Sequence, residues 1–256
     1  MKPFLIDIHC HLDAPEFDKD RDELIKKTLT EGVSIITIGA DEKSSKKAIE
    51  IAEKYDGVFV SAGIHPDNFL EGFNEKIFRD LIKHPKVVAI GECGLDWRAN
   101  NGKEKQKELF IKQIELAIDV DKPLVIHCRD AHAEVIKILK NYKTQFGDKL
   151  RGGIHFFTGS IKEAEEYMIL GFSFSFTGVI TFADSYDEVL KFLPLEKIMI
   201  ETDAPLVAPI PYRGKRCESL YVKEVAKRIA ELKLIDYDKV AAITTANAVR
   251  VFNLPM

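Results

Sequence analysis

Histidines gather at positions where buried strands are expected to end. The chain has seven histidines, and five of them lie at or just after the ends of apolar runs: His9, His11, His65, His127 and His155. His9 and His11 are two residues apart, so both imidazoles point to one side of a strand. That arrangement suits two adjacent ligand positions on one metal ion.

Two carboxylates end apolar runs in the same way. Glu92 closes VVAIGE, and Asp203 closes IMIETD. A carboxylate at the end of a buried strand is costly unless it is paired or bound to a cation. The simpler alternative is a rim carboxylate in a salt bridge. Glu201 lies two residues before Asp203, so it is expected on the same face, where it can support a ligand from behind.

This set of ligands indicates the kind of metal ion. Imidazoles and carboxylates without thiolates suit hard or borderline divalent ions, namely Mg²⁺, Mn²⁺, Zn²⁺, Co²⁺ or Ni²⁺. The number of candidate ligands exceeds what one catalytic zinc uses, which predicts two metal ions bridged by Glu92. Two divalent ions outweigh the charges of Glu92 and Asp203, so the site should attract an anion, and phosphodiesters are the obvious class.

The segment after Asp203 adds basic residues. It reads APLVAPIPYRGKRC, and its prolines stiffen a loop that carries Arg213, Lys215 and Arg216. Arginine can hold a phosphate through two hydrogen bonds, although such a loop can also be merely solvated.

Two other segments are candidates for substrate contacts. Residues 158–160 in HFFTGS are expected at a helix N-terminus, which can bind an anion. Trp97, the only tryptophan, can stack on a base or simply pack against the protein.

The elements that position these residues alternate between strand-like and helix-like segments. The strands, apolar throughout as expected of strands covered on both faces, are predicted at 4–9, 34–39, 58–63, 87–92, 123–127, 152–156, 172–177 and 197–202. Helices are predicted at 104–120, 160–170, 218–233 and 237–252. Ser160 and Glu163 form a capping-box signature, and Gly171 suits a helix end.

Eight such alternations predict a single-domain (β/α)₈ TIM barrel spanning residues 1–256. In that fold the catalytic residues collect at the C-terminal ends of the strands. An open doubly wound sheet is the alternative, but no glycine-rich phosphate-binding motif follows any strand.

The bulk properties narrow the class of protein. The net charge is −4 and the pI is near 6.0, so any binding of a polyanion must be local. No signal peptide or membrane span is recognised, which predicts a cytoplasmic protein with no membrane association and no obligate protein partner. Cys10, Cys93 and Cys128 each follow a candidate ligand, so they are expected to face the helices as reduced, buried thiols.

As an ordered set, these motifs resemble those of the TatD-type deoxyribonucleases of the amidohydrolase superfamily. The matching segments are DIHCHLD (7–13), AGIHP (62–66), IGECGLD (90–96), IHCRDA (126–131), HFFTGS (155–160), ETDAPLVAP (201–209), PYRGKR (211–216) and TTANAVRVF (244–252). The resemblance extends from end to end. It implies metal-dependent hydrolysis of phosphodiester bonds in DNA, often from the 3′ end, with single-stranded ends as substrate.

The resemblance also implies roles for individual residues. The first metal would be held by His9, His11, Glu92 and Asp203. Glu92 would bridge to a second metal, held with His127 and His155. Asp203 would orient or deprotonate the attacking water.

Two further positions would contact the substrate, His65 near the scissile phosphate and Arg213 at a phosphate. The family usually continues the GKR segment with Asn-Glu-Pro, whereas this chain has Cys217-Glu218-Ser219. This departure bears on the substrate contacts of the loop.

Two other functions stay open at this point. A hydrolase on the same scaffold can act on an amide or a lactone, because a fold does not fix a function. A non-catalytic nucleic-acid adaptor is the third possibility. The basic residues of segment 213–216 favour phosphodiesters, and the complete ligand set disfavours the adaptor.

Overall fold

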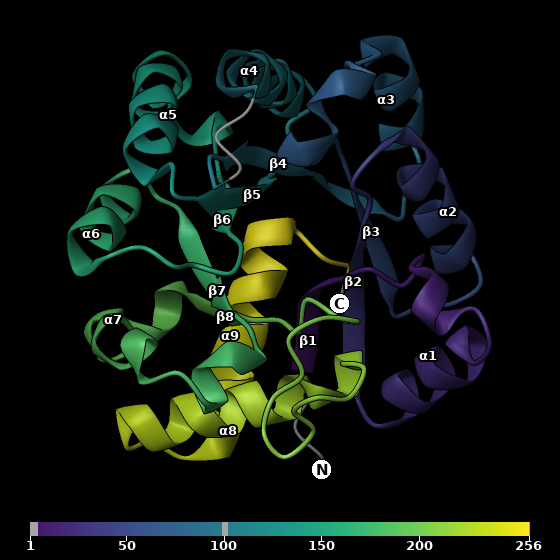
Figure 1. The fold of residues 1–256 in the computed structure, drawn as a ribbon, viewed down its shortest axis with the longest axis vertical. Helices are drawn as coiled ribbons and strands as arrows, with labels where there is room; N and C mark the ends of the chain where they lie inside the picture. Colours follow the sequence, from purple (N-terminus) through teal and green to yellow (C-terminus); the bar gives the residue numbers. More distant parts are fainter. Residues whose placement is uncertain (1–4, 99–101, 256) are drawn as a thin grey trace.

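The computed structural model describes residues 5–98 and 102–255. Eight parallel strands follow one another around a barrel in sequence order (Figure 1). They are β1 (Leu5–Cys10), β2 (Val33–Ile38), β3 (Val58–Ala62), β4 (Val87–Asp96), β5 (Leu124–Arg129), β6 (Gly152–Ile154), β7 (Ser173–Phe176) and β8 (Ile198–Ile200). The barrel and all eight predicted strands are confirmed, although Phe4, the first residue of the first predicted strand, lies outside the described residues.

Helices surround the sheet and return the chain to each next strand. They are α1 (Arg21–Thr30), α2 (Glu42–Ala52), α3 (Glu75–Ile82), α4 (Lys103–Asp119), α5 (His132–Phe146), α6 (Ile161–Ile169), α7 (Asp187–Phe192), α8 (Val222–Lys233) and α9 (Tyr237–Phe252). Short 3₁₀ helices lie in the connections: η1 (Pro15–Phe17), η2 (Pro66–Glu71), η3 (Gly147–Lys149), η4 (Gly178–Thr181), η5 (Asp184–Tyr186), η6 (Leu195–Lys197) and η7 (Ser219–Tyr221).

The predicted helices agree closely with α4, α6 and α9. The capping box of α6 is present, because the Glu163 carboxylate accepts a hydrogen bond from the Ser160 N–H at 2.7 Å and the Ser160 hydroxyl accepts one from the Glu163 N–H. The helix predicted from residue 218 begins later, since 219–221 form the 3₁₀ turn η7 and α8 starts at Val222.

Helix α9 covers the end of the barrel where the strands begin. Figure 1 shows it across the centre of the ring of strands, and the Asn247 side chain donates to the carbonyls of Leu195 and Ile198 at the start of β8. Phe252 of α9 belongs to the apolar cluster inside the barrel, with Ile6, Ile8, Phe59 and Met199 among its members. A second, larger cluster lies between the sheet and the outer helices.

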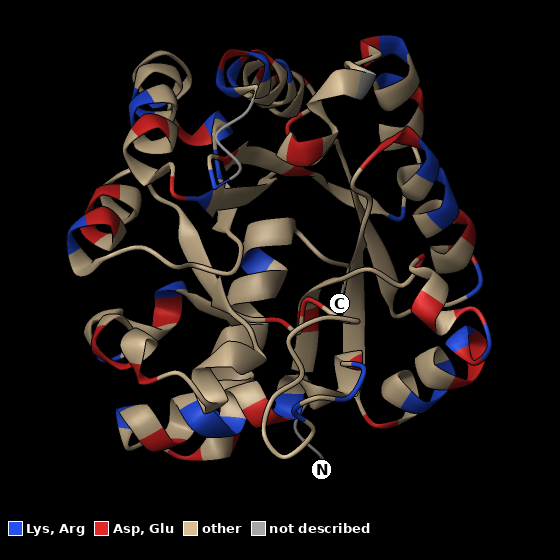
Figure 2. Ribbon diagram, in the orientation of Figure 1, with Lys and Arg blue, Asp and Glu red and all other residues tan. Residues whose placement is uncertain are grey.

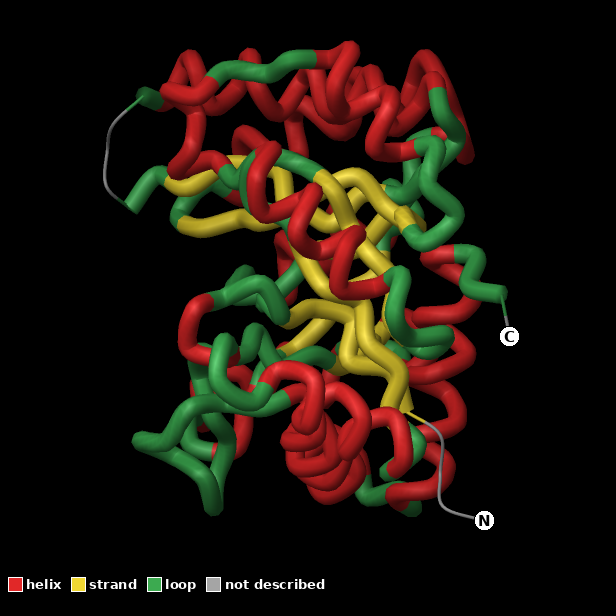
Figure 3. Tube along the Cα trace, turned by 90° about the vertical axis from the view of Figure 1, so that its right-hand side faces the viewer, coloured by secondary structure: helices red, strands yellow, loops and turns green. Residues whose placement is uncertain are grey.

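The loops after the strands gather at the opposite end (Figure 3). Charged residues of both signs are spread over the outer helices (Figure 2), in keeping with the small net charge. Among the described helices, none combines the length and apolar character that crossing a membrane requires.

Two β-bulges turn candidate ligands into the barrel. Strand β1 has one residue more than β2 between Asp7 and Cys10, and β4 has one more than β5 between Ile90 and Cys93. A bulge lets two consecutive side chains face the same way. Ile8 and His9 therefore both point inward, and Cys10 returns to the outer cluster.

Backbone and side-chain hydrogen bonds close the barrel between β8 and β1. The Asp203 N–H donates to the His9 carbonyl and the His11 N–H donates to the Ala204 carbonyl, both at 2.8 Å. The Asp7 carboxylate accepts from the N–H and the hydroxyl of Thr202, at 2.9 and 2.7 Å. This junction, hereafter the β8–β1 seam, brings Asp203 next to His9 and His11.

Replacing Phe252 by alanine should show how much the cover of the barrel contributes to stability. The side chain is 2% exposed, and truncating such a phenylalanine leaves a cavity that costs about 3–5 kcal/mol. Denaturant unfolding should report a loss of that size for Phe252→Ala. Ile169→Ala, at a side chain that is 78% exposed, is the control and should change the free energy of unfolding by less than about 0.5 kcal/mol. Equal effects of the two substitutions would show that α9 does not close the core.

Candidate metal centre

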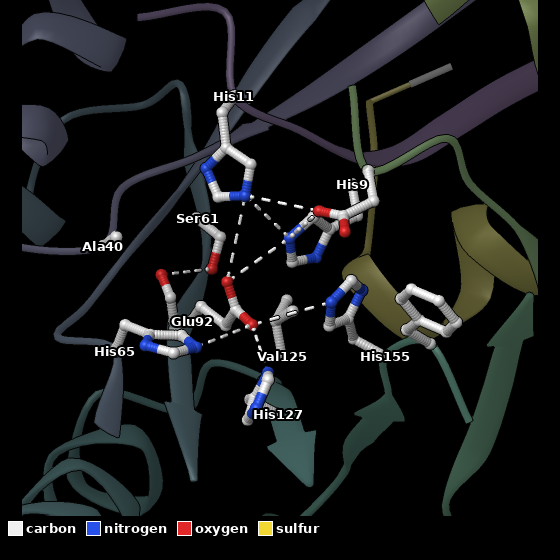
Figure 4. A network of polar contacts seen from close by, with 12 residues as sticks. His9, His11, Ala40, Ser61, His65, Glu92, Val125, His127 and His155 are labelled. Atoms are coloured by element: carbon white, nitrogen blue, oxygen red, sulfur yellow. Dashed lines mark hydrogen bonds and ion pairs between the residues drawn. The ribbon is translucent and has the colours of Figure 1, made fainter. Parts of the chain in front are cut away.

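Glu92 lies at the centre of the predicted site (Figure 4). One oxygen, Oε2, is 3.4 Å from His9 Nε2 and 4.0 Å from His11 Nε2. The other oxygen, Oε1, faces three more imidazoles, at 2.8 Å from His127 Nδ1 and 3.6 Å from the Nε2 atoms of both His65 and His155. The five histidines predicted from the strand ends therefore converge on a single carboxylate.

Four ligand atoms form a first group beside the β8–β1 seam. His9 Nε2 and His11 Nε2 are 3.3 Å apart, and Asp203 Oδ1 lies 3.7 and 3.5 Å from them. With Glu92 Oε2 they form a cluster of the size that metal coordination needs, because ligand atoms about 2.1 Å from a tetrahedral ion lie about 3.4 Å from one another.

A second group forms around the other oxygen of Glu92. Glu92, His127 and His65 each offer an atom to a common centre. His155 lies between the two groups, because its ring stacks on that of His9 with the centroids 3.5 Å apart while its Nε2 also faces Glu92 Oε1. The two groups thus share Glu92, as expected of a bridging ligand.

Carboxylates behind His127 and His155 fix the orientation of these rings. His127 Nε2 is 3.0 Å from Asp96 Oδ2. His155 Nδ1 is 2.9 Å from Glu201 Oε1, an ion-pair distance, although the angle at the ring departs from hydrogen-bond geometry. Glu201 is itself held by the Ser175 hydroxyl and the Phe156 N–H, both at 2.7 Å, so its carboxylate stays beside His155. The other ring nitrogen of each histidine, Nδ1 of His127 and Nε2 of His155, therefore points toward Glu92.

His65 differs from His127 and His155 in the hydrogen bond that its other ring nitrogen makes. Its Nδ1 accepts a hydrogen bond from the Asp67 N–H at 3.1 Å. A neutral imidazole that accepts at Nδ1 carries its proton on Nε2, and burial, the largest influence, lowers the pKa of His65 despite the charge of Glu92. The nitrogen that faces Glu92 is therefore a hydrogen-bond donor, which fits the predicted contact with substrate better than a metal ligand.

The charges of the cluster compensate one another. Burial by itself would raise the pKa of Glu92, but the imidazoles of His65, His9 and His155 hold it well below the usual range. Burial lowers the pKa of His127, and the hydrogen bonds to Asp96 and Glu92 outweigh that effect and raise it to about 10. A metal ion must displace such protons, so its binding should release protons and weaken as the pH falls.

The donor set fits divalent cations. Nitrogen and carboxylate oxygen atoms converge without thiolates, because Cys10, Cys93 and Cys128 lie in the outer cluster as predicted. His9 Nδ1, by contrast, is buried without a hydrogen-bond partner among the described residues.

Arg213 does not join the ligand groups. Its side chain is exposed, and its guanidinium lies 4.1 Å from the ring centre of Phe182. Arg216 is held by Asp20 through two hydrogen bonds of 2.8 and 2.7 Å, so its guanidinium is engaged within the protein. Of the three basic residues in the loop, Arg213 and Lys215 remain exposed.

The departure at Cys217-Glu218-Ser219 is accommodated without disturbing the ligands. The Cys217 N–H donates to the Pro205 carbonyl at 3.0 Å, and Glu218 Oε1 lies 3.3 Å from Arg216. Ser219 is buried at the start of η7.

Two predicted substrate contacts are already engaged within the protein. The Ser160 N–H at the start of α6 donates to Glu163, and that carboxylate disfavours an anion there. The Trp97 ring lies under the ammonium groups of Lys103 and Lys107, at 4.5 and 5.6 Å from the ring centre. Asp96 was not predicted as a partner of His127, because β4 continues four residues beyond the predicted end at residue 92.

A family model and full-length relatives match this chain. The profile described as TatD related DNase matches residues 6–253. A *Bacillus subtilis* (strain 168) protein named uncharacterized metal-dependent hydrolase YabD is 42% identical, over 98% of this chain and 99% of its own. A *Cronobacter sakazakii* protein named 3′-5′ ssDNA/RNA exonuclease TatD is 34% identical over 97% of each chain. The crystal structure of YjjV, a TatD homologue from *Escherichia coli* K12, superposes with a TM-score of 0.91 at 28% identity, covering all of both chains.

Substituting Glu92 by glutamine should reduce the metal content of the purified protein. A neutral amide cannot bridge two cations as a carboxylate does, so elemental analysis should find a loss of at least half of the bound divalent metal. Glu50→Gln, on the outer face of α2, is the control and should retain it. Full metal content in Glu92→Gln, with circular dichroism unchanged, would show that Glu92 does not bridge.

Proposed function

Because this chain belongs to the TatD family of metal-dependent hydrolases, we propose that it is a deoxyribonuclease that degrades single-stranded DNA from the 3′ end with two divalent ions. The observation that carries the proposal is the sharing of Glu92 by two groups of ligand atoms at the barrel mouth. The relative named as a 3′-5′ ssDNA/RNA exonuclease supports the substrate class and the direction.

The proposed ligands divide between two ions. One ion would be held by His9, His11, Glu92 and Asp203, and the other by Glu92, His127 and His155. His65 is left out, because its Nδ1 hydrogen bond places the proton on the nitrogen that faces the site. Mg²⁺, Mn²⁺, Zn²⁺, Co²⁺ and Ni²⁺ all suit such ligands.

The side chains around the ions have distinct proposed tasks. Bound divalent ions supply Lewis-acid activation of water and of the scissile phosphate. Asp203 has one oxygen toward His9 and His11, and its carboxylate orients the attacking water and accepts its proton. His65 donates its Nε2–H to a phosphate oxygen. Arg213, on its exposed loop, holds a flanking phosphate.

Two other functions were considered from the sequence, a non-catalytic adaptor and a hydrolase that acts on an amide or a lactone. The family and its nuclease-named members are hydrolytic enzymes acting on ester bonds, which disfavours a non-catalytic adaptor. An amide- or lactone-cleaving enzyme would use the same ligands, so the choice of substrate has to separate it. A cytoplasmic location and the lack of an obligate protein partner belong to the same proposal.

The test of this function is digestion of single-stranded DNA labelled at either end. We expect a 5′ label to yield a ladder of shortened products and a 3′ label to be released as a mononucleotide. EDTA should abolish both, and Mg²⁺ or Mn²⁺ should restore them. A cyclic amide and a lactone serve as competing substrates. Turnover of either in place of DNA, or full activity in metal-stripped protein, would contradict the proposal.

Asp203→Asn should separate proton transfer from metal binding. The amide oxygen can still coordinate an ion but cannot accept a proton, so kcat should fall roughly 10²–10⁴-fold with little change in KM. Elemental analysis of the same preparation is the control. Metal lost in proportion to activity would make Asp203 a ligand alone, and unchanged kcat would remove it from the site.

Arg213→Ala should weaken cleavage of an oligonucleotide far more than cleavage of bis(*p*-nitrophenyl) phosphate, which has no flanking phosphate. The guanidinium is exposed and has no ion pair among the described residues, so its loss should hardly affect folding. Arg151→Ala, which removes an arginine paired with Asp121 at the start of β6, is the control. Equal losses on both substrates would place Arg213 at the scissile phosphate.

A further inference from the structure

We propose that a small cavity beside the second ligand group receives a nucleobase next to the scissile phosphate, so that the substrate end must be unpaired. The cavity has a volume of about 140 Å³, and its walls include Arg129, Phe156, Thr158 and Tyr186 together with the rings of His127 and His155. The inference rests on the proposed nuclease function and adds a recognition site to it.

The position of the cavity limits what can enter it. His127 and His155 belong both to its wall and to the Glu92 cluster. A group bound there is therefore within one nucleotide of a phosphate held at the metal centre. Three larger depressions, of about 870, 700 and 760 Å³, lie elsewhere, and their described walls include no residue of the ligand groups.

The size and walls of the cavity match a planar ring. Its volume is well below the roughly 300 Å³ at which pockets for drug-sized ligands begin, so a whole nucleotide does not fit but a single ring system does. Phe156 and Tyr186 supply aromatic surface, which stacks on any base regardless of sequence. Arg129 and Thr158 add hydrogen-bond donors. A base still paired in a duplex would have to leave its partner to enter.

The inner wall is rigidly held. The Phe156 N–H donates to Glu201 at 2.7 Å, and Phe156 has a left-handed φ of 43°. The Thr158 hydroxyl lies 3.5 Å from His132 Nε2, while His132 Nδ1 lies 3.2 Å from Cys128 Sγ and 3.1 Å from the Tyr167 hydroxyl. This buried network ties the loop after β6 to the start of α5.

Tyr186 is the wall residue best suited to a test. It is half-buried at the end of η5, in the loop after β7, and it belongs to neither group of candidate ligands. Removing its ring should therefore weaken the contact with a base without removing a metal ligand.

The experiment measures whether Tyr186 and a substrate base depend on each other. The substrates are an oligonucleotide with all its bases and two versions that carry an abasic residue at the terminal or the penultimate 3′ position. For the wild-type protein, an abasic residue at one of the two positions should lower kcat/KM roughly tenfold relative to the complete oligonucleotide, as expected for the loss of one base–aromatic stack. Tyr186→Ala should lose less than twofold at that position, and Tyr186→Phe should behave like wild type.

Tyr142→Ala is the matched control. Tyr142 is another half-buried tyrosine, but it stacks on Phe146 and donates to Glu115 on the outside of the barrel, so its loss should preserve the wild-type sensitivity to an abasic residue. The proposal is overturned if Tyr186→Ala and wild type show the same loss at both positions, or if wild type shows none. If Arg129→Ala lowers kcat/KM equally for the complete and the abasic oligonucleotides, the cavity binds a phosphate and not a base. That result would also contradict the proposal.

The two proposals can fail separately. If wild-type protein cleaves none of these oligonucleotides, the nuclease function is wrong, and the cavity is then judged by equilibrium binding of the same fluorescently labelled oligonucleotides. Tighter binding of the complete oligonucleotide than of an abasic one, lost in Tyr186→Ala, would support the cavity. Equal affinities would reject it.

Discussion

The β8–β1 seam is the constraint on which the candidate site depends. Its backbone hydrogen bonds belong to the ligand residues themselves, since Asp203 donates to the His9 carbonyl. Asp7 completes the junction through Thr202, and burial raises its pKa to about 7 against the hydrogen bonds that favour the anion. Asp203 has a φ of 59°, a left-handed conformation that persists only when its surroundings hold it. The contacts that close the barrel therefore also bring the first group of candidate ligands together.

Candidate ligands could be chosen from the sequence, whereas the way they turn inward could not. A polar residue at the end of an apolar run is visible in one strand, so His9, Glu92 and Asp203 were chosen without a structure, and the structure brings them close together. A bulge is a mismatch between two strands, and it becomes visible only when the partner is known. Gly91 illustrates this, because a Cβ there would lie 2.4 Å from the Val125 carbonyl oxygen of the neighbouring strand. Gly94 likewise lets β4 approach His127 and continue to Asp96.

The predicted substrate contacts at the surface also depend on partners within the protein, some of them distant in the sequence. The start of α6, the Trp97 ring and Arg216 each had the right chemistry for a substrate contact, and each meets a partner within the protein. Asp20, which holds Arg216, is far from it in sequence, so no local pattern could reveal that pair. Helix α9 shows the same limit, because its periodicity gave its bounds but not its place over the end of the barrel. Spacing predicts elements and strand ends, while pairing between distant segments decides which side chains remain available.

The roles that we propose for His65, His127 and His155 follow from the partners of the ring nitrogens that face away from Glu92. His127 and His155 each face a carboxylate through one nitrogen, so each can present a lone pair to a cation from the other. His65 accepts a backbone hydrogen bond through its Nδ1, so it presents a proton instead. The three rings surround the same oxygen of Glu92 at comparable distances, and proximity alone would assign them the same role. In the proposed assignment, the second nitrogen of each ring separates a metal ligand from a hydrogen-bond donor. Asp96, Glu201 and the backbone of η2, which hold these nitrogens, therefore belong to the candidate site as much as the rings do.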